Sequence, residues 1–261
     1  MASRRSEDVE NDSTNRAGTS ATTRASEATR KLLQALAAGE FRPGERLRMD
    51  ALCKLLGAGS SPVREALNRL AAQGLIDQYD QRGFWVPPVS LADLEELTNT
   101  RCWINEIAVR ESIKKGDAVW EERIVVALHR LNQAARLRDE GEQGAPAEWE
   151  RRHREFHRAL ISGCGSRLLI DFAETLLDRA ARYRYLAVSV TGHSRNVAGE
   201  HSEIAEAALA RDAERTISLL TAHLMRTMRL AGAFANAGQA ATAKRRGRNS
   251  PPHQSAADPR P

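Results

Sequence analysis

Two histidines stand four residues apart in the stretch WERRHREFHRAL, which covers residues 149–160. In an α-helix, positions i and i+4 lie on one face, one turn apart, so His153 and His157 could bind the same metal ion. Zinc proteases use this histidine spacing, but their catalytic glutamate directly follows the first histidine. Here Glu155 comes two residues after His153, about 200° around the helix, and faces away from the pair. The spacing therefore indicates a metal site that lacks the base a protease needs.

Two further histidines fall in a predicted helical hairpin whose turn is at Arg211 and Asp212. At 1.5 Å per residue, His201 and His223 are each about 15–17 Å from this turn, so an antiparallel hairpin places them at the same level. Both positions lie on apolar helix faces. Each histidine alone would more often be a hydrogen-bonded core or surface residue. Four inward-pointing histidines from three helices, however, would suit a divalent metal, zinc first, with nickel, cobalt or manganese as alternatives.

Composition limits the class of protein. The 261 residues are 41% hydrophobic and 28% charged, which is typical of a soluble protein of one or two domains. No apolar run approaches the roughly 18–20 residues that a membrane helix needs, and the N-terminus has no apolar stretch that could act as a signal peptide. Three widely spaced cysteines form neither a disulfide framework nor a paired metal motif. We therefore expect a cytoplasmic protein that does not bind membranes.

The net charge of +5 is concentrated at the C-terminus, because residues 240–261 hold five basic side chains and one acidic side chain. Their Arg, Pro and Ser content is typical of a disordered segment. Such a tail could add weak, salt-sensitive attraction to DNA, or it could be a solvated tail with no role.

The region 23–88 predicts a winged helix-turn-helix. Its pattern predicts three helices, at residues 26–38, 49–56 and 60–74, and then a short hairpin that turns at Gly83. Ser60 or Ser61 is expected to cap the third helix, with Pro62 in its first turn. Helix-turn-helix domains place their last helix in the major groove of DNA, so the third helix is the candidate for reading sequence.

The segments FRPGERL, SSPVREALNRLAAQGLI and RGFWV resemble the DNA-binding domain of the GntR family of bacterial transcription regulators. Ser60, Ser61 and Arg64 begin the third helix, where hydroxyls, a guanidinium and free backbone N–H groups can meet phosphates and base edges. Arg82 and Gly83 form the hairpin tip, where a missing side chain allows close approach to DNA. These five residues are the predicted DNA-binding site.

The resemblance has one departure in this segment. Many relatives carry Ser-Arg where this chain has Gly59-Ser60, so an operator sequence should not be borrowed from them. Arg64 has an alternative role in a salt bridge on the helix surface. Glu65 and Arg69, at i and i+4, are predicted to form such an internal pair.

From Ser90 onward the sequence predicts only helices, which an antiparallel bundle would assemble. Ser90 and Asp93 form a capping box, and Asp117 is expected to cap the next helix. The fold class is therefore mainly α, with an N-terminal winged domain and a helical bundle. The predicted parts are a disordered segment at 1–22, the winged domain at 23–88, the helical domain at 90–237 and a disordered basic tail at 238–261.

The helical region contains the segments REFH, EHSEIAEAALARDAERT and HL. With these segments it resembles the all-helical effector (FCD) domain of the FadR subfamily of GntR regulators. With the N-terminal match, the resemblance covers about residues 25–235. It implies metal ligands at the positions of His153, His157, His201 and His223, although the first is usually aspartate. Four neutral imidazoles leave the +2 charge of the ion uncompensated, which favours an anionic ligand.

A fifth position extends the resemblance toward an effector. Arg101 matches a position that lines the effector pocket in the family, where it could clamp a carboxylate. The residue four positions later is usually Glu in the family and is Asn105 here, so the detail of the pocket differs.

The sequence thus predicts a homodimeric regulator that binds a pseudo-palindromic site in double-stranded DNA and responds to a small carboxylate bound at the metal. One alternative is a regulator with a purely structural or directly sensed metal and no organic effector. A metalloenzyme is less favoured, because no carboxylate lies on the histidine faces and because an enzyme would not explain the winged domain. We therefore expect no catalytic residues.

Overall fold

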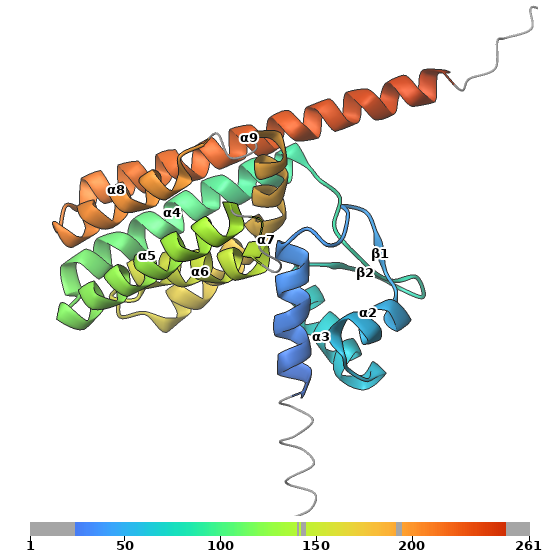
Figure 1. Ribbon diagram of the computed structural model, residues 1–261, viewed down its shortest axis with the longest axis horizontal. Helices are drawn as coiled ribbons and strands as arrows, with labels where there is room; N and C mark the ends of the chain where they lie inside the picture. The colour runs from blue at the N-terminus through green and yellow to red at the C-terminus, as the bar shows by residue number, and fades with distance from the viewer. Residues whose placement is uncertain (1–23, 140, 142–144, 192–194, 249–261) are drawn as a thin grey trace, which may run out of the picture.

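The computed structural model describes residues 24–139, 141, 145–191 and 195–248. The winged domain packs beside one end of a long helical bundle (Figure 1). Its elements in chain order are a helix over residues 24–37, β1 (Arg46–Leu47), α2 (Met49–Leu56), α3 (Ser60–Ala72), β2 (Asp77–Tyr79) and β3 (Gly83–Trp85). The described helices include none that is long and apolar enough to cross a membrane.

The winged domain is held together by a core of its own, in which Leu32, Val63, Leu67 and Leu70 are fully buried. These residues recur at helical spacing, so the helix over 24–37 and α3 each turn an apolar face inward. The predicted hairpin is present as β2 and β3. It belongs to a three-stranded antiparallel sheet of order β1-β3-β2, in which Gln78 pairs with Phe84. The two-residue strand β1 was not predicted.

The start of α3 corrects one prediction. The N-cap residue is Gly59, and no side chain caps the helix, so neither Ser60 nor Ser61 is the cap. Both serines already lie inside the first turn of the helix, with Pro62 behind them. Their hydroxyls therefore do not cap the N-terminus of α3.

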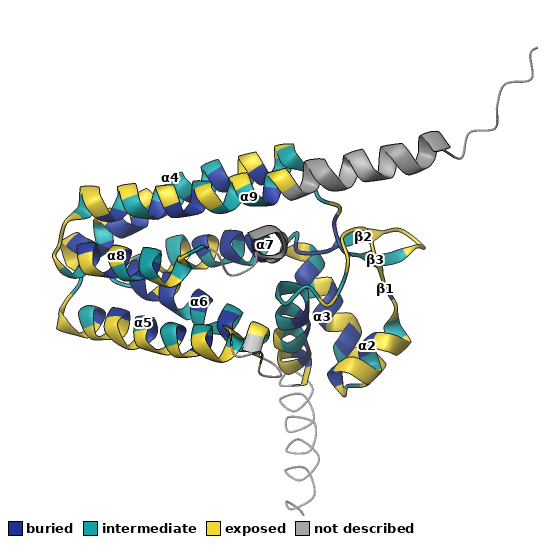
Figure 2. Ribbon diagram, turned by 45° about the horizontal axis from the view of Figure 1, so that its top comes forward, coloured by how far each residue is buried: buried dark blue, intermediate teal, exposed yellow. Residues whose placement is uncertain are grey.

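The helical domain is an antiparallel bundle, as predicted (Figure 2). Phe156, Trp120, Ile124, Leu131 and Ile204 are among its fully buried residues. Its helices are α4 (Leu91–Lys115), α5 (Ala118–Asp139), α6 (Ala145–Ile161), α7 (Arg167–Thr191), α8 (Val197–Leu209) and α9 (Ala213–Arg248).

Helix ends in this domain follow the predicted caps. Ser90 Oγ accepts a hydrogen bond from the Asp93 backbone N–H, and Asp117 Oδ1 accepts one from Trp120. The Asp93 carboxylate also accepts a hydrogen bond from the Tyr183 hydroxyl at 2.5 Å.

The last helix differs from the prediction at its C-terminus. Helix α9 continues to Arg248, past the predicted boundary at 237. The rest of the predicted tail, 249–261, and the predicted disordered segment 1–22 lie outside the described residues.

Candidate metal centre and DNA-binding surface

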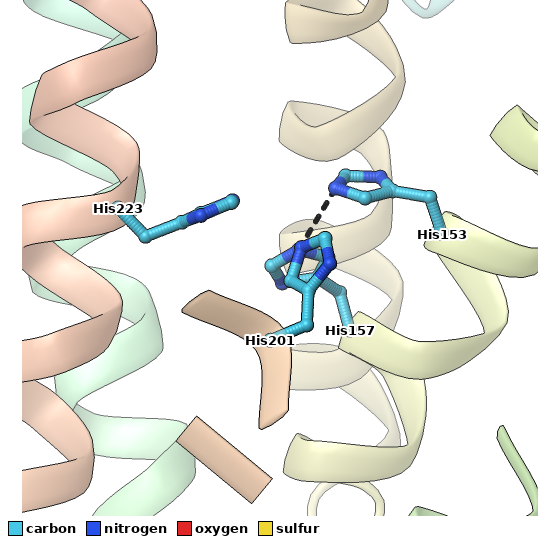
Figure 3. Close-up of side chains that lie close together, drawn as sticks. All are labelled: His153, His157, His201 and His223. Carbon is cyan, nitrogen blue, oxygen red and sulfur yellow. Dashed lines mark hydrogen bonds between the residues drawn. The ribbon is translucent and has the colours of Figure 1, made fainter. Parts of the chain in front are cut away.

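The structure brings the four predicted histidines together. His153 and His157 project from α6, His201 from α8 and His223 from α9, and they converge inside the bundle (Figure 3). One ring nitrogen from each lies within 4.8 Å of the others. The i, i+4 pair on α6 and the level placement across the α8–α9 hairpin therefore produce one cluster.

All four imidazoles are withdrawn from solvent, with at most 5% of any residue exposed. Burial lowers the pKa of each ring below its usual range, and the neighbouring histidines lower it further at His153, His157 and His201. At His223 the hydrogen bond with Glu200 opposes this effect. All four rings are accordingly neutral at neutral pH, which is the form that binds metal.

The distance between the two ring nitrogens on α6 fits a shared ion. Two nitrogens that each lie about 2.0–2.1 Å from one metal are about 2.9 Å apart in octahedral geometry and about 3.4 Å apart in tetrahedral geometry. His153 Nε2 and His157 Nε2 are 3.1 Å apart. His201 Nε2 is buried without a hydrogen-bond partner among the described residues. A divalent ion would bind this nitrogen and so satisfy it. Without an ion, the buried nitrogen carries a desolvation cost.

Glu200 orients one of the four rings, which the sequence analysis did not predict. Its Oε2 lies 2.8 Å from His223 Nδ1, and the same oxygen accepts a hydrogen bond from Arg195 at 2.5 Å. Burial acts to raise the pKa of the Glu200 carboxyl, but the bonds with His223 and Arg195 outweigh it and hold that pKa well below its usual range. The bond leaves Nε2 as the free nitrogen of His223, in the manner of the carboxylates that support metal-bound histidines.

Trp149 supports a second ring. It stacks on His153, with ring centroids 4.8 Å apart and an angle of 23° between the planes. The guanidinium of Arg138 covers the Trp149 ring, 4.7 Å from its centroid. Trp149 stands one helical turn before His153, so the sequence could have revealed this contact as another i, i+4 pair.

Arg101 lies beside the cluster. It lines a narrow pocket together with His157, Asn105, Ala173 and Leu177. Its Nε is buried without a hydrogen-bond partner among the described residues. Burial, and then the charge of Arg184, lower the pKa of the Arg101 guanidinium to about 9, so it is still a cation at neutral pH. The position usually occupied by Glu in the family is the neutral Asn105 here, and its side-chain amide donates a hydrogen bond to the Arg101 backbone carbonyl at 2.7 Å.

A second buried cation lies nearby. Arg184 of α7 is 8% exposed and pairs with Glu150 of α6 at 2.6 Å. Its charge is among the causes that lower the pKa values of Arg101 and His153. The sequence analysis missed this pair because its members are 34 residues apart in the chain.

The winged domain presents its candidate residues outward. Ser60, Ser61 and Arg64 are exposed near the start of α3. The first turn of this helix contains no acidic residue. Glu65 forms the predicted ion pair with Arg69. This pair leaves Arg64 as a guanidinium on that face without a carboxylate partner among the described residues.

Comparison with known proteins now bears on both sites. The family model described as "Bacterial regulatory proteins, gntR family" matches residues 24–86, and the "FCD domain" model matches residues 96–226. The chain belongs to the GntR family. Both the fold class and the absence of an enzymatic role agree with the prediction, because these families and their relatives are transcription regulators.

Sequence relatives of this GntR regulator match most of the chain. It is 39% identical over 203 residues to the uncharacterized HTH-type transcriptional regulator BphR of Paraburkholderia xenovorans, covering 76% of this chain and 81% of the relative. It is 32% identical over 191 residues to the HTH-type transcriptional repressor GlaR of Escherichia coli, covering 72% and 86%.

Solved structures of GntR proteins share the fold. McbR/YncC of E. coli superposes with a TM-score of 0.68 at 21% identity, over 80% of this chain and 96% of that protein. A GntR transcriptional regulator from Rhodococcus sp. RHA1 superposes with a TM-score of 0.65 at 23% identity, over 81% and 99%.

The wing of this GntR regulator has the predicted geometry at its tip. Arg82 is exposed, and Gly83 has a φ of 87°. A side chain at this φ would be strained, so glycine is needed to turn the hairpin. The tip and the start of α3 belong to one small domain, as a composite DNA-binding surface requires.

Proposed function

We propose that this GntR regulator is a repressor whose operator binding is controlled by a small carboxylate captured at a divalent metal in the helical domain. The observation that carries the proposal is the cluster of four buried, neutral histidines beside Arg101, whose Nε has no hydrogen-bond partner among the described residues. His153, His157, His201 and His223 would hold the metal, with zinc favoured because imidazole ligands suit it. Nickel, cobalt or manganese would fit an octahedral version of the site.

The charge of the site selects an anion. Imidazole ligands bring no negative charge, so the +2 charge of an ion would be partly balanced only by Glu200, which is hydrogen-bonded to one ligand ring. Arg101 and Arg184 add two more positive charges, and Glu150 balances one of them, while Glu174, which also lines the Arg101 pocket, is paired with Arg158. A carboxylate that reached the metal and Arg101 together would complete this balance through charge-assisted hydrogen bonds.

The same contacts argue against metal-assisted catalysis. A hydrolase needs a carboxylate or another base free to activate water at the ion. Glu200 is hydrogen-bonded to one of the rings, and it is held by His223, Arg195 and Arg226. The metal would supply Lewis acidity, which here orients a bound carboxylate. Regulation through ligand capture therefore fits the site better than turnover.

The alternative is a regulator with a structural or directly sensed metal. Four protein ligands can close a tetrahedral site, which would leave no position for an organic ligand. Isothermal titration of metal-loaded and metal-stripped protein with a panel of small carboxylates separates the two. Our proposal expects at least one carboxylate to bind only the loaded protein, and metal binding without any carboxylate binding would favour the alternative.

The variant His157→Ala removes one of the proposed metal ligands. We expect it to release the metal and to abolish carboxylate binding while leaving affinity for a duplex selected from a random DNA library unchanged. His129→Ala is the control, because His129 is an exposed histidine on α5. A variant His157→Ala that retains one ion per chain would remove His157 from the ligand set.

DNA binding requires a second recognition helix for a pseudo-palindromic operator, so we propose a homodimer. In each protomer Ser60, Ser61, Arg64, Arg82 and Gly83 would contact the operator. A regulator of chromosomal operators acts in the cytoplasm, and we propose that compartment. Light scattering at micromolar concentration tests the dimer, since a monomeric mass would contradict it.

A further inference from the structure

Helix α7 belongs to the helical bundle and also faces the winged domain (Figures 1 and 2). On the bundle side, Ala173 and Leu177 line the pocket that contains Arg101. On the other side, Asp178, Arg179 and Ala181 face a narrow apolar pocket whose opposite wall belongs to the winged domain. Leu33, Leu36, Leu75 and Val86 are part of that wall. One helix thus touches the candidate effector pocket and the DNA-binding domain.

One contact fixes α7 to the winged domain, and a second joins it to the start of α4. The Arg179 guanidinium lies against Gly74, where an added Cβ would be 3.0 Å from Arg179 Nη2. Gly74 follows the end of α3 with a φ of 67°, so a glycine serves both the turn and this close approach. One turn further on, the Tyr183 hydroxyl reaches Asp93 and the Ser90 carbonyl at the start of α4, directly after the wing.

Three ion pairs join α7 to the metal-ligand helix α6: Glu174 pairs with Arg158, and two further pairs stand beside His153. Asp178 pairs with Arg154, and Arg184 pairs with Glu150 at 2.6 Å. On α6 the two partners stand on either side of His153. The Asp178, Arg184 and Glu150 side chains are 13%, 9% and 12% exposed. Because breaking the buried Arg184–Glu150 pair would leave an uncompensated charge, we expect α6 and α7 to move together.

We propose that α7 carries the state of the metal centre to the winged domain, through the Arg154–Asp178 pair on one side and the Arg179–Gly74 contact on the other. Leu177, Asp178 and Arg179 are consecutive, so each points about 100° from the last, toward the pocket, α6 and the winged domain in turn. A closely packed core transmits a shift of α6 to α7 because its elements do not deform independently. The inference rests on the proposed function and names how that site is read.

Hydrogen–deuterium exchange with zinc as the only ligand tests this relay. In the wild type, zinc should slow amide exchange in α6 directly, and also in α7 around residues 175–183 and in the winged segments 33–43 and 74–76. An effect on the order of tenfold is typical of coupled sites. Burial raises the pKa of Asp178 to about 6, so measurement at pH 7.5 keeps its carboxylate ionised.

Asp178→Asn removes the pair without changing side-chain size. We expect zinc to protect α6 as before, but to lose its effect on the two winged segments. Asp171→Asn is the control, since Asp171 pairs with Arg167 on the exposed side of the same helix. Arg179→Ala is a second variant, which removes the contact between α7 and Gly74 of the winged domain. It should leave zinc protection of α6 and α7 intact and remove only the protection of the winged segments.

The outcomes are distinguishable. Absence of zinc protection in α6 of the wild type would defeat the proposed metal centre. Protection of α6 with none in the winged segments of the wild type would overturn the relay alone. Winged-segment protection that survives in both Asp178→Asn and Arg179→Ala would also overturn it.

Discussion

The two candidate sites of this GntR regulator are built in opposite ways. The start of α3 takes Ser60, Ser61 and Arg64 from one short stretch and exposes them to solvent. The metal centre takes four histidines from three helices that span 71 positions, 153–223, and buries them. A surface for DNA must remain open to a large partner, whereas a metal centre must exclude water from its ligands.

Burial makes the helical site costly in a way that the DNA-binding surface is not. Neutral rings inside the bundle raise no charge problem, but a proton on any of them would. Exposed serines and arginine on α3 carry no such penalty. Change of pH, removal of Glu200 and removal of Arg64 should therefore affect the two sites to very different degrees.

Acid should have the largest effect, and only on the helical site. The usual histidine pKa of 6.5 applies to the unfolded chain, and burial lowers the pKa of all four rings in the folded state. Above pH 6.5 both states are neutral, and as pH falls the unfolded chain takes up protons first. Metal-free protein should lose up to about 1.4 kcal/mol of unfolding free energy per pH unit for each ring.

Urea unfolding at pH 7.5 and at lower pH, with and without zinc, checks this expectation. Asp178 acts in the opposite direction, because its pKa is raised to about 6 and the folded state takes up that proton first. The opposing effect of this single carboxylate is smaller than the combined effect of the four histidines. Because burial lowers the pKa of all four rings, metal binding should weaken with acid only below the usual histidine range. Metal-free stability that does not fall below pH 6.5 would contradict neutral buried rings.

Glu200→Gln should have an intermediate effect. The amide cannot compensate the charge of a metal-bound His223, so zinc affinity should fall about 10–100-fold, as for other supporting carboxylates. DNA affinity of the metal-free protein should not change. Competition with a chromophoric chelator measures the affinity, with Glu203→Gln, at an exposed position of α8, as the control. Equal affinities in the two variants would exclude a supporting role for Glu200.

Arg64→Ala should have an effect confined to the winged domain. Loss of a base or phosphate contact should weaken binding to a selected duplex by about 1–3 kcal/mol and leave zinc affinity unaltered. Arg69→Ala is the control on the same helix, because its guanidinium is already paired with Glu65. A gel-shift affinity that is the same in both variants would take Arg64 out of the interface.

The local parts of this account could be predicted from sequence. Histidines at i and i+4, two histidines level across a hairpin, and the PVREAL segment each depend on residues close in the chain or on simple helix geometry. The prediction that Ser60 or Ser61 caps α3 was wrong. Serine is a good N-cap at either position, but the helix begins at Ser60, directly after Gly59.

The supporting contacts could not be predicted. Arg154 and Asp178 are 24 residues apart, Glu150 and Arg184 are 34 apart, and Tyr183 is 90 residues from Asp93. Ion pairs of this kind depend on which helix faces meet, and hydrophobic spacing specifies a face without specifying its neighbour. Strand β1, with two residues, is too short to show any alternation.

The central claim is that four histidines hold one divalent ion. X-ray absorption spectroscopy at the zinc edge, on protein purified without an affinity tag and loaded with one equivalent of zinc, tests it most directly. The account predicts a first shell of four imidazole nitrogens at about 2.0–2.1 Å, with any added oxygen coming from a bound carboxylate. A shell dominated by oxygen, or containing sulfur, would contradict it.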